Sequence, residues 1–180
     1  MVGESSYAEW DVRRATRAID TVYKAMIILA CVVFFVGSVV FTGNSFIKFL
    51  FTAALIAMLF LCFYVWWPRF NVVYEYVYVD GQIDFDAIYS GSSRKHLFRV
   101  DMDKIDVVAP LGASELAGYE HLNLKARNFS SYDKANESKQ YVIIAKGNSD
   151  NAHEKIIFEP SEEMLTLMKK KSPRKINIAK

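Results

Sequence analysis

Aspartate is the residue type in this chain whose spacing comes closest to that of a functional site, in this case a metal-binding site. Between residues 80 and 106 it occurs at Asp80, Asp84, Asp86, Asp101, Asp103 and Asp106. On a strand, the carboxylates of Asp84 and Asp86 would share one face and could hold Ca²⁺ or Mg²⁺. Alternating aspartate is also typical of the wet face of a half-buried strand, and the sequence lacks calcium-loop spacing. We therefore expect no metal site.

Histidine, serine and cysteine do not complete a catalytic arrangement. His96, His121 and His153 lack the HxxxH and HExxH spacings of metal ligands, and the sequence has neither a GxSxG motif nor a P-loop. Cys31 and Cys62 lie within apolar runs, where cysteine ordinarily behaves as a small hydrophobic residue. We expect a protein that is not an enzyme, with no catalytic residue and no cofactor.

Charge divides the chain into two parts. Between residues 25 and 67 the only charged residue is Lys48, whereas residues 71–180 contain equal numbers of basic and acidic residues. Binding to nucleic acid ordinarily needs a basic face, so a polar part without net charge argues against such a partner.

Two apolar runs, residues 25–41 and 49–67, predict a transmembrane helical hairpin. Each run approaches the ~20 residues that are needed to cross a hydrocarbon core of ~30 Å. The polar residues 42–45 between the runs form too short a link for anything but antiparallel neighbours. Pro68 is expected to end the second helix.

Basic residues flank the hairpin on its outer sides. The first run follows Arg13, Arg14, Arg17 and Lys24, and the second precedes Arg69, whereas the inner loop offers only Lys48. This bias predicts a multi-pass protein of the cell membrane with both termini in the cytoplasm and the lipid bilayer as a partner. A cleaved signal peptide is the alternative, but the first run starts late and a second run follows it.

Residues 1–24 are expected to form an amphipathic helix that leads into the membrane, because Val12, Ala15 and Ile19 recur at helical spacing. Such a helix could lie among lipid head groups, or it could serve only as a topology signal. The residues expected at the membrane interface are Trp10, Arg13, Arg14, Arg17, Trp66, Trp67 and Arg69.

Residues 71–180 predict a cytoplasmic domain of mainly antiparallel strands. Two β-rich segments, residues 72–79 and 82–89, are joined by Asp80-Gly81, which predicts a two-residue hairpin turn. Further strands are expected at residues 97–100, 105–109, 122–127, 141–146 and 155–158, with turns at 90–93 and 147–151.

A C-terminal helix is predicted over residues 161–171, since its acidic start and its lysine-rich end match the helix dipole, and Pro173 prevents its continuation. Six or seven strands followed by one helix need a nearly closed arrangement, because an open sheet would leave exposed edges. The predicted fold class is therefore α+β. It comprises a transmembrane helical hairpin and a small barrel or sandwich of the pleckstrin-homology (PH)-like type with a C-terminal helix.

The order of these features resembles that of small bacterial membrane proteins with two transmembrane helices and a PH-like cytoplasmic domain. The residues that carry the resemblance are Trp67-Pro68, the Tyr-rich strand, Asp80-Gly81 and the final strand and helix. Residues 158–164 and Pro173-Arg174-Lys175 are similar to a clostridial group of such proteins. The resemblance covers nearly the whole chain and implies the fold, but no motif in it is catalytic.

Lipid-binding PH domains hold phosphoinositide with basic residues around the first hairpin. Here that turn is Asp80-Gly81, and Asp84 and Asp86 lie beside it, so we do not expect phosphoinositide binding. Arg94 and Lys95 in the next turn either touch lipid or face solvent.

Two functions remain open. The first is a non-catalytic interaction or scaffold module that presents the PH-like domain to another membrane or membrane-associated protein, with residues 111–139 either as a contact segment or as a flexible insertion. The second is an accessory subunit of a membrane transport or envelope complex. In that case the hairpin would be the interface, through the small residues Gly37-Ser38 and Ala53-Ala54.

Overall fold

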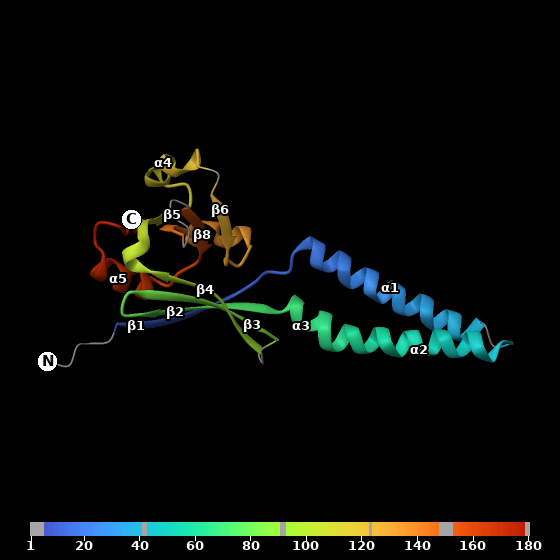
Figure 1. The fold of residues 1–180 in the computed structure, drawn as a ribbon. Coiled ribbons are helices and arrows are strands. Elements are labelled where there is room, and N and C mark those ends of the chain that lie inside the picture. Colours follow the sequence, from blue (N-terminus) through green and yellow to red (C-terminus); the bar gives the residue numbers. More distant parts are fainter. Residues whose placement is uncertain (1–5, 41–42, 91–92, 123, 148–152, 179–180) are drawn as a thin grey trace. The chain divides into compact units, whose positions relative to one another are not determined.

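The computed structural model describes residues 6–40, 43–90, 93–122, 124–147 and 153–178. The chain divides into two compact units (Figure 1). A helical unit comprises Thr16–Val72, and a β-rich unit comprises Met1–Ala15 together with Val73–Lys180. The helical unit is therefore an insertion in the sequence of the β-rich unit, and the β-rich unit begins before the first helix.

The helical unit is a hairpin of two long helices that lie side by side (Figure 1). Helix α1 spans Ala18–Val40, and α2 spans Ser45–Leu61. The chain then continues through a π-helical turn, η1 (Cys62–Trp66), and a last turn, α3 (Trp67–Phe70). By length and composition, α1 and the stretch Ser45–Trp66 are apolar enough to cross a membrane. The helical part of the predicted hairpin is therefore confirmed.

Close packing joins the two helices near the loop end. Gly37 of α1 is buried, and a Cβ atom placed on it would lie 2.4 Å from Cδ1 of Phe51 of α2. Phe34 and Phe51 also pack ring to ring, with their centroids 6.2 Å apart. The small residue at position 37 is therefore used inside the hairpin.

Pro68 does not end the second helix as predicted. The helical path continues to Phe70, with Pro68 in the first turn of α3. Proline is tolerated there because the π turn has already shifted the hydrogen-bond pattern: the N–H of Trp67 donates to the carbonyl of Cys62, five residues back. The helix ends where Asn71 leaves helical geometry.

Sheet one of the β-rich unit has four strands in the order β1-β2-β3-β4. The strands are β1 (Tyr7–Arg13), β2 (Val72–Val79), β3 (Gln82–Tyr89) and β4 (Ser93–Asp101). The β2–β3 connection is the predicted turn, in which Asp80 (φ +47°) and Gly81 (φ +99°) both have positive φ. Such a pair is the hallmark of the tight hairpin turn that Asp-Gly favours.

Residues 7–13 form a strand, so the amphipathic helix predicted over residues 1–24 is wrong for this segment. β1 pairs antiparallel with β2 from Tyr7 opposite Val79 to Arg13 opposite Val73. Ala8 and Val12 are buried, as in a strand with period two. The helical spacing of the apolar residues describes the structure only from the start of α1 onward. The predicted domain over residues 71–180 is incomplete, because the β-rich unit also includes Met1–Ala15, which carries its first strand.

Sheet two has the order β5-β7-β8-β6. The strands are β5 (Ile105–Pro110), β6 (Lys125–Asn128), β7 (Tyr141–Lys146) and β8 (His153–Phe158). All its pairings are antiparallel except that of β6 with β8. The C-terminal segment adds a parallel bridge between Ile176 and Val108, which covers the outer edge of β5. The predicted turns at residues 90–93 and 147–151 lie partly outside the described residues.

Helix α5 (Glu162–Lys171) packs on the core of the β-rich unit, as predicted. Ser161 caps its start, since its Oγ accepts the N–H of Met164 at 3.2 Å. Met164, Leu165 and Met168 are buried in a core that also contains Tyr76 and Phe158, whose ring centroids are 5.8 Å apart. The α+β class, with two mainly antiparallel sheets and a C-terminal helix, is thereby confirmed.

A second, smaller core lies on sheet two. Val142, Ile144 and Ala109 are buried under Leu116, which belongs to η3 (Ser114–Leu116). The short helix α4 (Ala117–Glu120) follows, and η4 (Lys134–Lys139) leads into β7. Three further elements, η3, α4 and η4, thus belong to residues 111–139, in addition to β6. Leu111, Leu116 and Leu124 of this segment pack on sheet two. The contact segment and the flexible insertion considered from the sequence both stay predictions.

Candidate functional site

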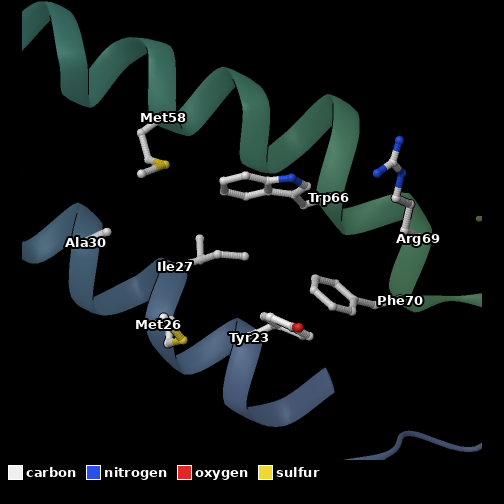
Figure 2. A pocket seen from close by; sticks show the side chains of 8 residues that line it. All are labelled: Tyr23, Met26, Ile27, Ala30, Met58, Trp66, Arg69 and Phe70. Atoms are coloured by element: carbon white, nitrogen blue, oxygen red, sulfur yellow. The ribbon is translucent and has the colours of Figure 1, made fainter. Parts of the chain in front are cut away.

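The helical unit contains an apolar groove between α1 and the end of the second helix (Figure 2). We call it the interhelical groove, and its volume is about 540 Å³. Its lining residues are Tyr23, Met26, Ile27 and Ala30 from α1, Met58 from α2, Trp66 from η1, and Arg69 and Phe70 from α3.

The π turn helps to place both Met58 and Trp66 on the groove. In a regular α-helix, residues seven apart lie almost above one another, whereas residues eight apart are clearly rotated. The wider π turn takes up one additional residue between these two positions. Trp66 thereby returns to the side of the helix that carries Met58, and Figure 2 shows both side chains directed toward α1.

One end of the interhelical groove carries most of the positive charge of the helical unit, since Lys48 alone lies at the loop end. The ammonium of Lys24 lies 5.0 Å from the ring centroid of Phe70 and 6.0 Å from that of Trp67. Arg69 lies at the same end, with its guanidinium outside the apolar part of the groove (Figure 2). At the start of α1, Arg17 forms an ion pair with Asp20 at 3.5 Å. This end can therefore attract an anion, whereas the groove itself suits an apolar chain.

The outer face of sheet one carries a second charged cluster, in which Arg94 has the central place. Arg94 forms ion pairs with Glu75 and with Asp86, whose Oδ2 lies 2.7 Å from its Nε. His96 Nδ1 lies 2.8 Å from the other oxygen of Asp86. Asp84 and Asp86 share a face as predicted, but basic residues of β4 neutralise both, since Asp84 pairs with Arg99.

The acidic residues that come closest to a metal-ligand set differ from those that the sequence suggested. Glu9, Asp11 and Glu75 each offer an oxygen within 4.8 Å of the other two. Burial raises the pKa of Glu75, the charge of Arg94 opposes that rise, and the nearby Glu9 adds to it. The sequence signal that could have found this group is the alternation in Tyr7–Arg13, which places Glu9 and Asp11 on one strand face.

A buried carboxylate joins three segments of the β-rich unit. Oε1 of Glu159 accepts the N–H of Ser131 at 3.0 Å, the hydroxyl of Ser131 at 2.7 Å and the amide of Gln140 at 3.3 Å. The N–H of Ala15, the last residue before the helical unit, donates to the carbonyl of Ser131 at 2.7 Å. This network holds the chain in place just before it enters the hairpin.

The residues predicted at the membrane interface fall into both units. Trp66, Trp67 and Arg69 lie together at the end of the second helix, and Arg17 immediately precedes α1. Trp10 and Arg13 belong to strand β1, and Arg14 follows it. Contact of these residues with lipid stays a prediction. The sequence did not lead us to predict that Tyr23, Met26 and Ala30 line a groove. Their spacing of three and four residues does indicate that they share one face of a helix.

Comparison with known proteins gives one match that spans the chain. A family model described as "Bacterial PH-like domain (DUF6106)" matches residues 4–178, which include both β1 and the helical insertion. No curated protein and no solved structure matches the chain.

Proposed function

This chain belongs to the bacterial PH-like domain family DUF6106, and on that basis we propose that it is a membrane-anchored, non-catalytic interaction module. The helical hairpin spans the cell membrane, and the PH-like unit presents its surface to a membrane or membrane-associated protein. Lys and Arg around the hairpin favour the cytoplasmic side for both termini.

One observation carries the proposal: the apolar helices leave and re-enter the β-rich unit between two paired strands. Arg13 and Val73 lie opposite each other on β1 and β2, so the hairpin has two connections to the domain at one place. Large side chains such as Ile56 and Phe60 are more than half exposed, which suits hydrocarbon as their solvent. A domain held in this way stays near other membrane components, at a raised effective concentration.

The charged side chains of the β-rich unit support a non-catalytic role, because they form ion pairs with one another. In the described part of the chain, the strongest cluster lies on an open sheet face and consists of ion pairs among Glu75, Asp86, Arg94 and His96. Arg94 is held by two carboxylates there, which favours a structural role for it over contact with lipid.

The accessory-subunit alternative places the interface on the hairpin. Gly37 gives it less support than the sequence suggested, because its open face is already filled by Phe51. Ala53 is exposed and keeps that alternative worth testing.

Photo-crosslinking in native membranes distinguishes the two functions. A photoreactive residue is placed in the full chain either at exposed positions of the β-rich unit, Tyr132 and Lys139, or at exposed positions of the hairpin, Ile56 and Phe60. The interaction module predicts adducts from the domain positions. Adducts from the hairpin positions alone would favour the accessory subunit.

Thiol labelling of sealed cells tests the topology, with Cys31 and Cys62 replaced by alanine. Gly43→Cys lies in the hairpin loop, where nothing lies within 4 Å of an added Cβ, and Ser138→Cys is exposed on the domain. A membrane-impermeant maleimide should label position 43 in intact cells and position 138 only after lysis. Equal labelling of both positions in intact cells would contradict the proposed topology.

A further inference from the structure

We propose that the interhelical groove binds one acyl chain of an anionic phospholipid, with the phosphate of its head group beside Lys24 and Arg69. This inference rests on the proposed insertion of the hairpin into a membrane and adds a ligand class to it. Three features of the groove favour an anionic phospholipid as its ligand. They are the apolar lining, the charge at one end, and the position between two helices that the proposed function places in hydrocarbon.

The lining of the groove suits an acyl chain. Met26, Ile27, Ala30 and Met58 supply an apolar surface, and the ring of Trp66 lies across it (Figure 2). The volume of about 540 Å³ lies in the range of pockets that bury a small ligand. An empty groove would leave these atoms without contact partners on one side, so in a bilayer a flexible lipid chain gains dispersion energy by filling it.

The charge at one end of the groove selects the head group. Phe70 lines the groove and also lies under the ammonium of Lys24, so this cation is fixed at the rim of the apolar slot. Arg69 adds a guanidinium there. The sequence Thr16–Val72 places Arg17, Lys24 and Arg69 at this end with one acidic residue, Asp20, so the charge of this end is net positive. Positive charge near a membrane surface attracts anionic lipid.

The groove fits a lipid chain better than a helix of a partner protein. Tyr23 and Phe70 stand at the same end as the cations, and the lining runs from there along only part of each helix (Figure 2). A helix would need a longer matching stripe. A lipid would place its phosphate at the charged end and its chain toward Ala30 and Met58, in the direction that a lipid of the same leaflet adopts.

Quenching of tryptophan by brominated lipid tests the proposal, because bromine quenches only rings that it touches. The full chain carries Trp66 as its only tryptophan, after Trp10→Phe and Trp67→Phe. It is inserted into phosphatidylcholine vesicles that contain a minor fraction of brominated phosphatidylglycerol or, separately, the same fraction of brominated phosphatidylcholine. A second chain reports on bulk lipid: all three tryptophans are phenylalanine, and Ile56→Trp, an exposed position of α2, carries the signal.

The proposal predicts that phosphatidylglycerol contacts Trp66 in at least about fivefold preference to phosphatidylcholine, which is the effect expected for one of the two basic contacts. The reporter at position 56 should show no preference. Lys24→Gln combined with Arg69→Gln should remove the preference, whereas the matched variant Lys48→Gln, at the loop end, should keep it. Ala30→Phe fills the groove and should protect Trp66 from both lipids without changing the quenching at position 56.

The outcomes separate this proposal from membrane insertion itself. If both lipids quench Trp66 equally, or if the preference survives Lys24→Gln with Arg69→Gln, the anionic lipid site is overturned and insertion stands. If position 56 is quenched but Trp66 is not, protein fills the groove and the lipid site is again overturned. If neither position is quenched, the hairpin does not enter the bilayer, and both proposals fail.

Discussion

Arg13 and Val73 face each other across paired strands although both long helices lie between them in the sequence. A segment that leaves a sheet on one strand and returns on the next must start and end at the same place. For a hairpin in a membrane, this means that both of its outer flanks are on one side of the bilayer. This agrees with the sequence prediction, which placed both flanks on one side because the link between the two apolar runs is short.

Removal of the hairpin should leave a stable, water-soluble domain. The variant joins residues 1–15 to residues 72–180 through a linker of about six Gly and Ser residues, a length that easily spans two neighbouring strands. Because β1 and β2 keep their register, we expect a monomer in buffer without detergent that unfolds cooperatively. Gel filtration and thermal unfolding by circular dichroism measure both properties.

The matched comparison is the chain that begins at Asn71 and so lacks β1. It loses the buried side chains of Ala8 and Val12 and exposes the edge of β2. We expect it to be less stable by at least about 2 kcal/mol, or to aggregate. Equal stability of the two chains would show that β1 does not belong to the domain.

Local patterns predicted the parts of the fold whose pairing is local. β2 and β3 were predicted to the residue, because their alternation is clear and Asp80-Gly81 fixes the turn between them. Strand β7 and helix α5 carry similarly strong signals in their own sequences. β1 was missed because its partner lies beyond the whole helical insertion, and its seven residues merge into the helical spacing that begins near Ala15.

The candidate groove could be predicted only in part. Aromatic and basic residues at a helix end marked Trp66 and Arg69 as interfacial. The groove also depends on a π turn at Cys62–Trp66, which has no simple sequence signal, and on the packing of Lys24 against Phe70. The π turn and the contact between Lys24 and Phe70 both arise from tertiary packing, which the periodicity of apolar residues in the sequence does not predict.

Substitution of Glu159 should destabilise the β-rich unit. Its Oε1 accepts three hydrogen bonds, so Glu159→Ala leaves the N–H and hydroxyl of Ser131 and the amide of Gln140 without this acceptor. We expect a loss of about 2–3 kcal/mol in the free energy of unfolding. Denaturant unfolding of the full chain in detergent micelles measures it. The exposed Glu137→Ala is the control and should change stability little; a similar loss in both variants would contradict the role of Glu159.

Glu75 should make the stability of the protein depend on pH. Its pKa is raised in the folded state by burial, so the folded protein holds this proton more tightly than the unfolded chain does. Its stabilising effect is complete below the ordinary glutamate value of about 4.5 and is lost as the pH rises through the raised pKa. The thermal midpoint should therefore fall over that interval in the wild type, and Glu75→Gln should remove this part of the fall.

Glu9→Gln provides a check on the cause. Because the neighbouring carboxylate of Glu9 helps to raise the pKa of Glu75, its removal should shift the fall in thermal midpoint to lower pH. A profile that is identical in the wild type and in Glu75→Gln would show that Glu75 does not titrate differently in the folded protein.

Gly37→Ala should weaken the helical hairpin. The added methyl group would lie 2.4 Å from Cδ1 of Phe51 and 2.5 Å from its Cε1, so the ring must move or the helices must separate. We expect a cost of about 1–3 kcal/mol, as for other overpacked sites, seen as a lower midpoint of thermal unfolding in detergent micelles. Gly43→Ala is the matched control, since nothing lies within 4 Å of its Cβ position.

Phe51→Ala should relieve the clash, so Gly37→Ala made in the Phe51→Ala background should cost much less than in the wild type. An equal cost in both backgrounds would mean that the two helices do not meet at this pair.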